Sequence, residues 1–229
     1  TQNNQTYNAP ITFLQGSLAA PLTLQSLSGD IDLDSTVSAG TNSKGTQRSL
    51  SLQAANGDVY IRDQIGLDLD GVTRVAYASQ VDVNSYALTV NAQDIWLLAD
   101  ITTFEKQTYT GQVHVGNNGS NGTTRLLVSL DPSISFNGPI DDTTINGHIL
   151  DLRAVNLDPL SSLVPTIYLG GAIGEQVPLL GLNVYTGVQL PNALLSEVDQ
   201  APMSRNGLIM ITGDVNTYSD QNYVSGQVE

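Results

Sequence analysis

The chain has 229 residues, of which 40% are apolar and 13% are charged, and its formal net charge is −14. The apolar share is enough for a sizeable buried core and argues against a disordered chain. The excess of acids over bases argues against nucleic acids and anionic membrane surfaces as partners, because both require a basic footprint. Cysteine is absent, which excludes disulfides and thiolate metal sites.

The composition also bears on location. The charged fraction is about half of that in typical globular domains, so uncharged polar residues must cover the surface. Such surfaces are common in secreted β-proteins, and a chain without cysteine fits an exported bacterial protein. No apolar run is long enough to span a membrane, so membrane insertion is not expected. Because the chain starts with Thr1, we interpret it as a processed or excised piece of a longer protein.

Short alternations of apolar and polar residues, separated by Gly, Asn, Asp and Ser, predict many short strands along the whole chain. The only helix candidate is 192–198, between Pro191 and Pro202. The expected fold class is therefore all-β.

One strand template recurs six times: an apolar residue, any residue, an apolar residue, three residues, and an apolar residue. Its copies start at Ile31, Val59, Ile95, Ile134, Ile167 and Ile209. A second strand precedes most copies, with the apolar pairs Leu22/Leu24, Leu50/Leu52, Leu88/Val90, Leu150/Leu152 and Leu182/Val184. Constant strands with loops of variable length are typical of a solenoid, in which each coil contacts only its neighbours. The pattern predicts a right-handed parallel β-helix; a β-sandwich or jelly roll is the alternative.

A longer repeat is also present, since 100–109 aligns with 214–223 without a gap, and Gln5-Thr6-Tyr7 matches Gln107-Thr108-Tyr109. We expect one solenoid over 1–229, built of two internal repeats at about 5–106 and 107–220, with a loop insertion around 187–206. The chain then begins and ends at the same phase of the repeat. This predicts end-to-end self-association through Gln5, Tyr7, Ile11, Phe13, Gln221, Tyr223 and Val228.

The stretches that carry these patterns are 88–92, 94–97, 101–103, 107–115, 134–140, 171–174 and 178–184. Over nearly the whole chain the sequence resembles the filamentous-haemagglutinin-type adhesins and other large repetitive surface proteins of Gram-negative bacteria. The resemblance implies a right-handed parallel β-helix, export across the outer membrane, and adhesion or filament building. It supplies no catalytic residues.

In a β-helix of this kind, the six residues that start the template would stack into one interior ladder about 4.8 Å apart. The alternate positions, such as Asp32, Tyr60, Trp96, Ser135 and Tyr168, would face solvent. If each coil takes roughly 20 to 25 residues, the chain makes about ten coils.

Three alternating carboxylates, Asp30, Asp32 and Asp34, are a candidate calcium site on the outer face of one strand. Asp68 with Asp70, and Asp141 with Asp142, are similar candidates. The competing interpretation is a row of solvated carboxylates that discourages aggregation at a strand edge. Calcium is thus the one cofactor considered, and none is otherwise expected. Neither His114 nor His148 has the spacing of a metal motif.

Other side chains define weaker alternatives. Tyr60, Trp96, Tyr168 and Tyr185 are candidates for an aromatic strip that binds sugars. Arg62, Arg125 and Arg153 are the residues that a polysaccharide-degrading site would use, although isolated ion pairs are the simpler interpretation. Asn4, Asn118 and Asn121 lie in glycosylation sequons, which arise often by chance in such a composition.

Together these observations predict a non-enzymatic structural or adhesive segment of a bacterial cell-surface protein or extracellular filament. The expected partners are a second copy of the chain, or glycans or proteins on host or neighbouring cells. A carbohydrate-binding module and a polysaccharide-degrading enzyme on the same fold remain the alternatives.

Overall fold

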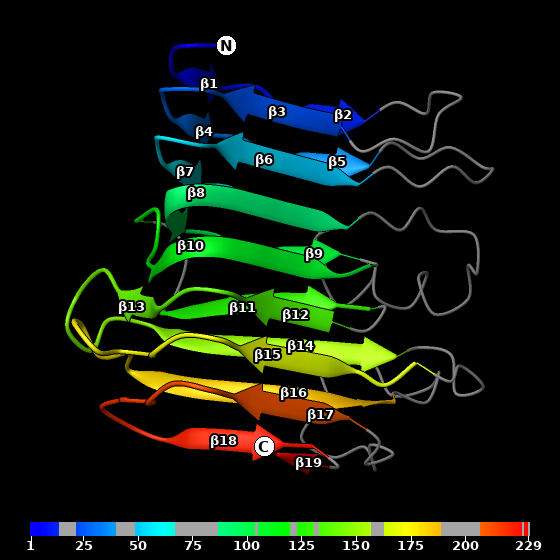
Figure 1. The fold of residues 1–229 in the computed structure, drawn as a ribbon, viewed down its shortest axis with the longest axis vertical. Coiled ribbons are helices and arrows are strands. Elements are labelled where there is room, and N and C mark those ends of the chain that lie inside the picture. Colours follow the sequence, from blue (N-terminus) through cyan, green and yellow to red (C-terminus); the bar gives the residue numbers. More distant parts are fainter. Residues whose placement is uncertain are drawn as a thin grey trace.

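The structure is a computed structural model that describes residues 1–13, 22–39, 49–66, 87–103, 105–119, 123–130, 133–156, 163–188, 207–225 and 227–228. Every regular element in these ranges is a β-strand, and every strand pair is parallel. The strands stack along the long axis with the N-terminus at one end and the C-terminus at the other (Figure 1). The predicted parallel β-helix is confirmed. The helix candidate 192–198 lies outside the described residues.

Each coil passes over three faces, here called A, B and C in chain order. Face A holds β1 (Gln5–Tyr7), β4 (Ile31–Leu33), β7 (Val59–Ile61), the second halves of β8 (Leu88–Leu97) and β10 (Gln107–Val115), β13 (Ile140–Asp142), and bridges at Ile173 and Val215. Face B holds β2 (Ile11–Phe13), β5 (Val37–Ala39), a bridge at Ile65, β9 (Ile101–Thr103), β11 (Thr124–Ser129), β14 (Ile149–Asn156), β16 (Gly181–Val188) and β18 (Gln221–Val224).

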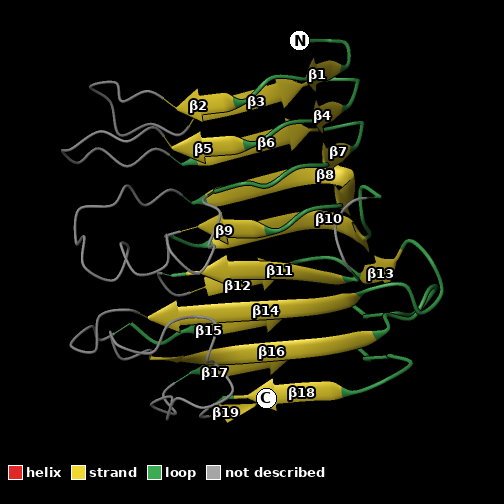
Figure 2. Ribbon diagram, turned by 180° about the vertical axis from the view of Figure 1, so that it is seen from behind, coloured by secondary structure: helices red, strands yellow, loops and turns green. Residues whose placement is uncertain are grey.

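Face C holds β3 (Leu22–Ser26), β6 (Leu50–Ala54), the first halves of β8 and β10, β12 (Ser133–Phe136), β15 (Thr166–Leu169), β17 (Leu208–Ile211) and β19 (Gln227–Val228). Faces A and C belong to one 12-stranded sheet, because β8 and β10 run continuously through the corner between them. The view from behind shows face B as a separate stack of strands (Figure 2).

In the described residues each face has eight rungs, against the expected count of about ten coils. On face A the rungs are centred on Gln5, Ile31, Val59, Ile95, Val113, Ile140, Ile173 and Val215. The coil length varies from 18 residues between Ile95 and Val113 to 42 between Ile173 and Val215. Variable loops on constant rungs are what a solenoid permits, because an insertion disturbs only its own coil.

Alternation along each strand places apolar side chains inside the coil. In β4 and β7 the outer residues of each triplet are buried and the central residue is partly exposed. The interior rows consist mainly of Ile, Leu and Val, because β-branched and aliphatic side chains pack well on a pleated surface that is buried along its length. The core therefore runs as a continuous column from one end of the described structure to the other.

The predicted single ladder is wrong in its second half. Ile31, Val59 and Ile95 do stack on face A, whereas Ile134, Ile167 and Ile209 stack on face C, in the row of Leu88 and Gln107. The last two pairs assigned to the second strand, Leu150/Leu152 and Leu182/Val184, lie on face B rather than face C. The two halves of the sequence follow the same template one face apart.

A glycine column marks the corner that leads from face C to face A. Gly29, Gly57, Gly111, Gly138, Gly171 and Gly213 each stand two residues before a face A rung. A Cβ on Gly138 would lie 2.1 Å from the carbonyl oxygen of Gly111 in the preceding coil. Successive coils therefore approach too closely at this corner for a side chain. Among the described residues, no glycine stands two residues before a face B rung, so glycine position was the register signal that the template missed.

Candidate functional site

Among the described residues, both ends of the interior column carry partly exposed apolar side chains. At the N-terminal end, Tyr7, Ile11, Leu22 and Leu24 pack against the core and stay partly exposed. At the C-terminal end the same is true of Ile211, Val215 and Tyr223. The strands β1, β2 and β3 at one end, and β18 and β19 at the other, pair on one side only among the described residues. Unpaired parallel edges over apolar side chains are surfaces that favour pairing with a further strand.

The residues predicted for self-association lie on these end strands. Gln5 and Tyr7 belong to β1, Ile11 and Phe13 to β2, and Gln221 and Tyr223 to β18. The last of them, Val228, lies in β19. Gln5, Tyr7 and Ile11 stand opposite the interior residues Ile31, Leu33 and Val37 of the next coil.

A seven-residue motif, Thr-x-x-x-Gln-x-Tyr, occurs at both ends and once in the middle of the chain. It covers residues 1–7, 103–109 and 217–223. In every copy the Tyr hydroxyl donates to the Gln side-chain oxygen, at 2.8, 2.8 and 3.0 Å respectively. In every copy the Thr hydroxyl also donates to the carbonyl two residues later. The sequence therefore dictates one local geometry three times.

The three copies differ in the face that they occupy. Gln5 lies on face A, Gln107 on face C and Gln221 on face B. The three copies therefore lie at different phases of the coil, and the predicted division of the chain into two sequence repeats stays a prediction. The motif fits every corner, because all three corners join an incoming turn to a strand whose alternate side chains point inward.

Burial separates the central copy from the terminal ones. The side chains of Gln107 and Tyr109 are fully buried, and the Tyr109 ring stacks on Phe136 of the next coil with centroids 4.8 Å apart. Gln107 Nε2 donates to the carbonyl of Val128 at 2.8 Å, so the polar end of the side chain has a partner inside the core. Burial raises the pKa of Tyr109 well above its ordinary value, and that of Tyr223 less strongly.

A ladder of rings runs along the outer side of face A. Tyr60 and Trp96 stack with centroids 5.8 Å apart, and Trp96 and His114 stack at 4.4 Å. The guanidinium of Arg62 lies over the Tyr60 ring, 4.8 Å from its centroid, and pairs with Asp32 at 2.7 Å. Both faces of Trp96 are occupied by neighbouring rungs. The ladder therefore presents ring edges outward, whereas a sugar platform needs a free ring face.

The other two aromatic residues predicted for a sugar strip lie elsewhere. Tyr168 is on face C, and Tyr185 is on face B beneath the guanidinium of Arg153, which is 5.5 Å from the ring centroid. The four aromatic residues therefore do not form one strip. His114, which lies 2.7 Å from the Asp94 carboxylate, is the third ring of the ladder and was missed because its rung belongs to the short coil.

Carboxylates next to this ladder have protein partners. The hydroxyl of Tyr60 donates to Asp58 at 3.0 Å, and burial together with this carboxylate raises the pKa of Tyr60 to about 12. Asp30 accepts the backbone N–H of Asp58 and the side-chain amide of Asn4. Asn4 in turn accepts the backbone N–H of Asp30, so these residues form a short ladder that links successive coils.

The predicted calcium ligands are Asp32 in β4 and the two residues that flank this strand, and they are engaged differently. Asp30 belongs to the ladder just described, Asp32 pairs with Arg62, and Asp34 is exposed. Within the described ranges, no group of three or more His, Asp or Glu side chains is arranged to hold a metal ion. Asp68 and Asp70 lie outside those ranges. Calcium binding stays a prediction.

The arginines predicted for polysaccharide cleavage lie apart. Arg62 is on the outer side of the corner after β7, Arg125 points into the core row of Leu150, and Arg153 is on the outer side of β14. Each pairs with its own carboxylate, from Asp32, Asp100 and Asp151 respectively. Burial lowers the pKa of Arg125, and Asp100 opposes this effect. The arrangement is that of separate ion pairs.

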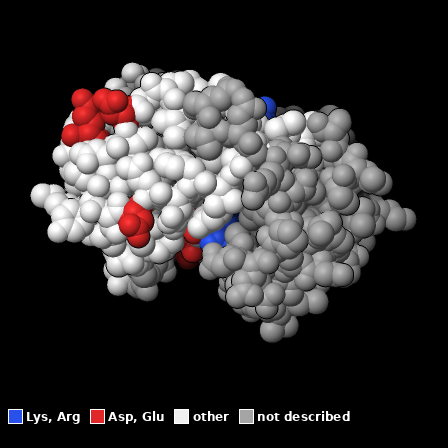
Figure 3. Space-filling view, turned by 90° about the horizontal axis from the view of Figure 1, so that it is seen from below, with Lys and Arg blue, Asp and Glu red and all other residues white. Residues whose placement is uncertain are grey.

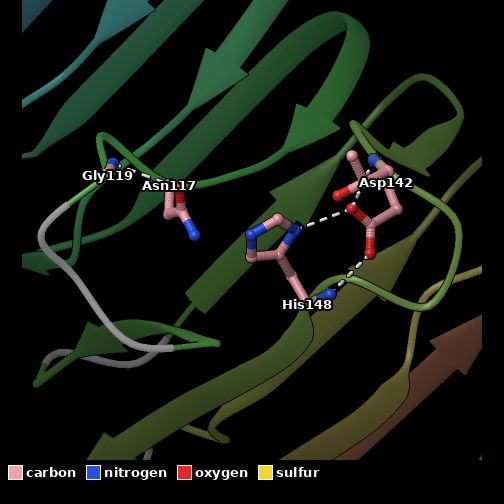
Figure 4. A network of polar contacts seen from close by, with 5 residues as sticks. Asn117, Gly119, Asp142 and His148 are labelled. Atoms are coloured by element: carbon pink, nitrogen blue, oxygen red, sulfur yellow. Dashed lines mark hydrogen bonds and ion pairs between the residues drawn. The ribbon is translucent and has the colours of Figure 1, made fainter.

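The described part of the chain also contains a buried histidine–aspartate pair. His148 Nδ1 lies 2.7 Å from Asp142 Oδ1, and the other oxygen of Asp142 accepts the backbone N–H of His148. Asp142 also accepts the backbone N–H of Thr144, so this carboxylate closes the turn after β13. The second ring nitrogen of His148 points toward Asn117, whose side chain accepts the N–H of Gly119 (Figure 4). The pair could not be predicted, because its spacing matches no known motif.

Two of the three sequon asparagines use their side-chain amides in hydrogen bonds. Asn4 donates to Asp30 at 3.3 Å, and Asn118 donates to the carbonyl of Arg62 at 3.2 Å. Asn121 lies outside the described residues. Glycosylation at Asn4 or Asn118 would replace one of these contacts.

Comparison with protein family models, with curated proteins and with solved structures gives no match to this chain. Among the described residues, no helix is long and apolar enough to cross a membrane. Function must therefore be argued from the geometry of the solenoid.

Proposed function

We propose that this chain is a structural segment of an extracellular bacterial surface protein or filament, and that it extends by pairing its end strands with a second copy. The observation that carries the proposal is the interior column, which reaches both ends with partly exposed Tyr7, Ile11, Val215 and Tyr223. A solenoid that works alone in water needs polar capping at its ends. In the described part of the chain, these ends instead combine apolar side chains with strands that pair on one side.

The surface at the C-terminal end supports this proposal. Seen along the long axis from that end, the described surface is mainly uncharged, and its acidic side chains form a few separate patches (Figure 3). A chain with a net charge of −14 repels its own copies, so an end with few charges is the place where two copies approach at least cost. The uncharged polar composition fits an extracellular location, and attachment to glycans or proteins on other cells is part of the same proposal.

The test is sedimentation velocity and negative-stain electron microscopy of the purified chain over a wide range of concentrations. We expect particles that lengthen with concentration at constant width. The same series with added calcium and with a chelator tests the calcium prediction separately. A single species of one-chain mass at every concentration would contradict assembly.

A matched pair of variants locates the contact. Tyr223→Lys places an ammonium group in the interior row at the C-terminal end, and it should abolish lengthening. Tyr218→Lys changes a side chain at the same end that is 73% exposed, and it should leave lengthening unchanged. Circular dichroism on both variants checks that the β-structure persists. Equal assembly by both variants would place the contact elsewhere.

A further inference from the structure

The interior rows give the register in which two copies would meet. On face A the row begins at Gln5 and ends at Val215, and on face B it begins at Ile11 and ends at Tyr223. On face C the row begins at Leu22 and ends at Val228. Each end therefore offers one member of every row.

The strand directions restrict how the ends can join. All strand pairs within the chain are parallel, and the path runs from face A through B to C in every coil. A head-to-tail contact keeps both properties, since β19 on face C is then followed by β1 on face A. A head-to-head contact would reverse one copy and force antiparallel pairing, with a different hydrogen-bond spacing.

The central and N-terminal copies of the seven-residue motif show which strand would supply an acceptor for the Gln side chain of the C-terminal copy. Gln107 lies on face C and donates to Val128 on face B of the next coil, two faces further along the chain. Gln5, on face A, donates to the carbonyl of Gln25, which is again two faces further along. For Gln221, on face B, the strand two faces further along would be β1 of a following copy.

The terminal motif is less complete within the described chain. The closest acceptor recorded for Gln221 Nε2 is the carbonyl of Val215 at 3.4 Å, at the limit of a hydrogen bond. Gln221 itself is exposed and Tyr223 is partly exposed, whereas Gln107 and Tyr109 are fully buried. A following coil would bury both side chains and place a strand beside the Gln amide, as β11 does for Gln107.

We infer that the partner of the C-terminal edge is the N-terminal edge of a second copy in a single register, with Val215 opposite Gln5, Tyr223 opposite Ile11 and Val228 opposite Leu22. This inference rests on the proposed function and adds its polarity and register. In this register Asn216 and Thr6, which follow Val215 and Gln5, stand opposite each other on the outer side of face A.

The test uses the absence of native cysteine. Residues opposite each other on neighbouring parallel strands have Cα atoms about 4.8 Å apart, which lies within the range that a disulfide spans. The variant Thr6→Cys with Asn216→Cys should therefore form disulfide-linked dimers and longer ladders under mild oxidation, because its two cysteines lie at opposite ends of one molecule. Both native side chains are exposed, so the exchange should leave the core intact.

The matched control is Thr6→Cys with Tyr218→Cys, which places the second thiol at the same end but out of register. Initial cross-linking by the in-register pair should be at least about tenfold faster, because disulfide geometry tolerates little displacement. Sedimentation of both reduced variants separates the two claims. Assembly with equal cross-linking of both pairs would overturn the register alone, whereas absence of assembly would overturn the proposed function as well.

Discussion

The central and C-terminal copies of one motif, at residues 103–109 and 217–223, show what the solenoid adds to a local sequence. Both copies hold a Tyr hydroxyl against a Gln side-chain oxygen, at 2.8 and 3.0 Å. Only the central copy is covered by a further coil, which stacks Phe136 on Tyr109 and supplies the Val128 carbonyl to Gln107. The local bonds follow from the sequence, whereas the burial depends on the neighbouring coil.

The largest expected effect tests this difference directly. Tyr109→Ala should lower the free energy of unfolding by about 3–5 kcal/mol, because it leaves a cavity under Phe136 and removes the donor to Gln107. Tyr223→Ala should cost only about 1 kcal/mol at concentrations below assembly, since its side chain is partly exposed. Urea unfolding followed by circular dichroism measures both. Similar losses of unfolding free energy in the two variants would show that Tyr223 is already buried in the single chain.

A second variant should uncover the central copy of the motif, so that it becomes as exposed as the C-terminal copy. Gly138 lies two residues after Phe136, and a Cβ there would meet the Gly111 carbonyl oxygen at 2.1 Å. Gly138→Ala should push the covering coil outward and cost about 2–3 kcal/mol, in the range of other overpacked sites. The control is Gly181→Ala, where the nearest atom is 3.3 Å away. Hydrogen exchange should show faster exchange around Gln107 in Gly138→Ala alone.

Removal of one hydroxyl gives a smaller effect. Tyr109→Phe should cost about 1–2 kcal/mol, because it leaves the buried Gln107 oxygen without its donor. Tyr223→Phe should change the free energy of unfolding by less than about 0.5 kcal/mol in the monomer, because water can replace the hydroxyl. Chemical unfolding of the two variants side by side provides the measurement. A larger loss of unfolding free energy in Tyr223→Phe than in Tyr109→Phe would show that Tyr223 is the more buried of the two.

The smallest effect is spectroscopic. Burial raises the pKa of Tyr109 well above 10.0, so the folded state favours the neutral phenol. The stability that this phenol contributes is fully present below pH 10 and is lost as the pH rises through the folded pKa. Tyrosinate absorbance during an alkaline titration should show Tyr223 ionising before Tyr109, and Tyr223→Phe should remove an early step. Tyr109→Phe should instead remove a step that coincides with unfolding.

The first half of the register could be predicted from the sequence and the second half could not. Ile31, Val59 and Ile95 were placed in the correct row, whereas Ile134 was assigned to face A and lies on face C. The corner from face A to face B and the corner from face C to face A have the same apolar spacing, since Leu33 to Val37 and Phe136 to Ile140 each span four residues. Apolar spacing alone cannot tell these corners apart, whereas the glycine that stands two residues before six of the eight face A rungs can.

The candidate site was predicted less completely than the fold. The end strands that carry Gln5, Tyr7, Gln221 and Tyr223 were predicted from the repeated motif, and they lie at the two ends. The pairing of His148 with Asp142 and the stacking of His114 on Trp96 were not predicted. The stacking of His114 on Trp96 depends on which residues successive coils bring together, and loop length decides this without leaving a pattern in the apolar residues. Asp142 and His148 instead meet within one coil, six residues apart, at a spacing that matches no known motif.

The strand content, the inward-facing alternation and the hydrogen bonds inside each Thr-x-x-x-Gln-x-Tyr motif follow from the amino-acid sequence, because they depend on neighbours within seven residues. The number of coils, the face that each strand occupies, and which copy of the motif is buried follow from the folded stack alone. Those features depend on where each variable loop returns the chain to the stack, and an 18-residue coil and a 42-residue coil end on the same face A row.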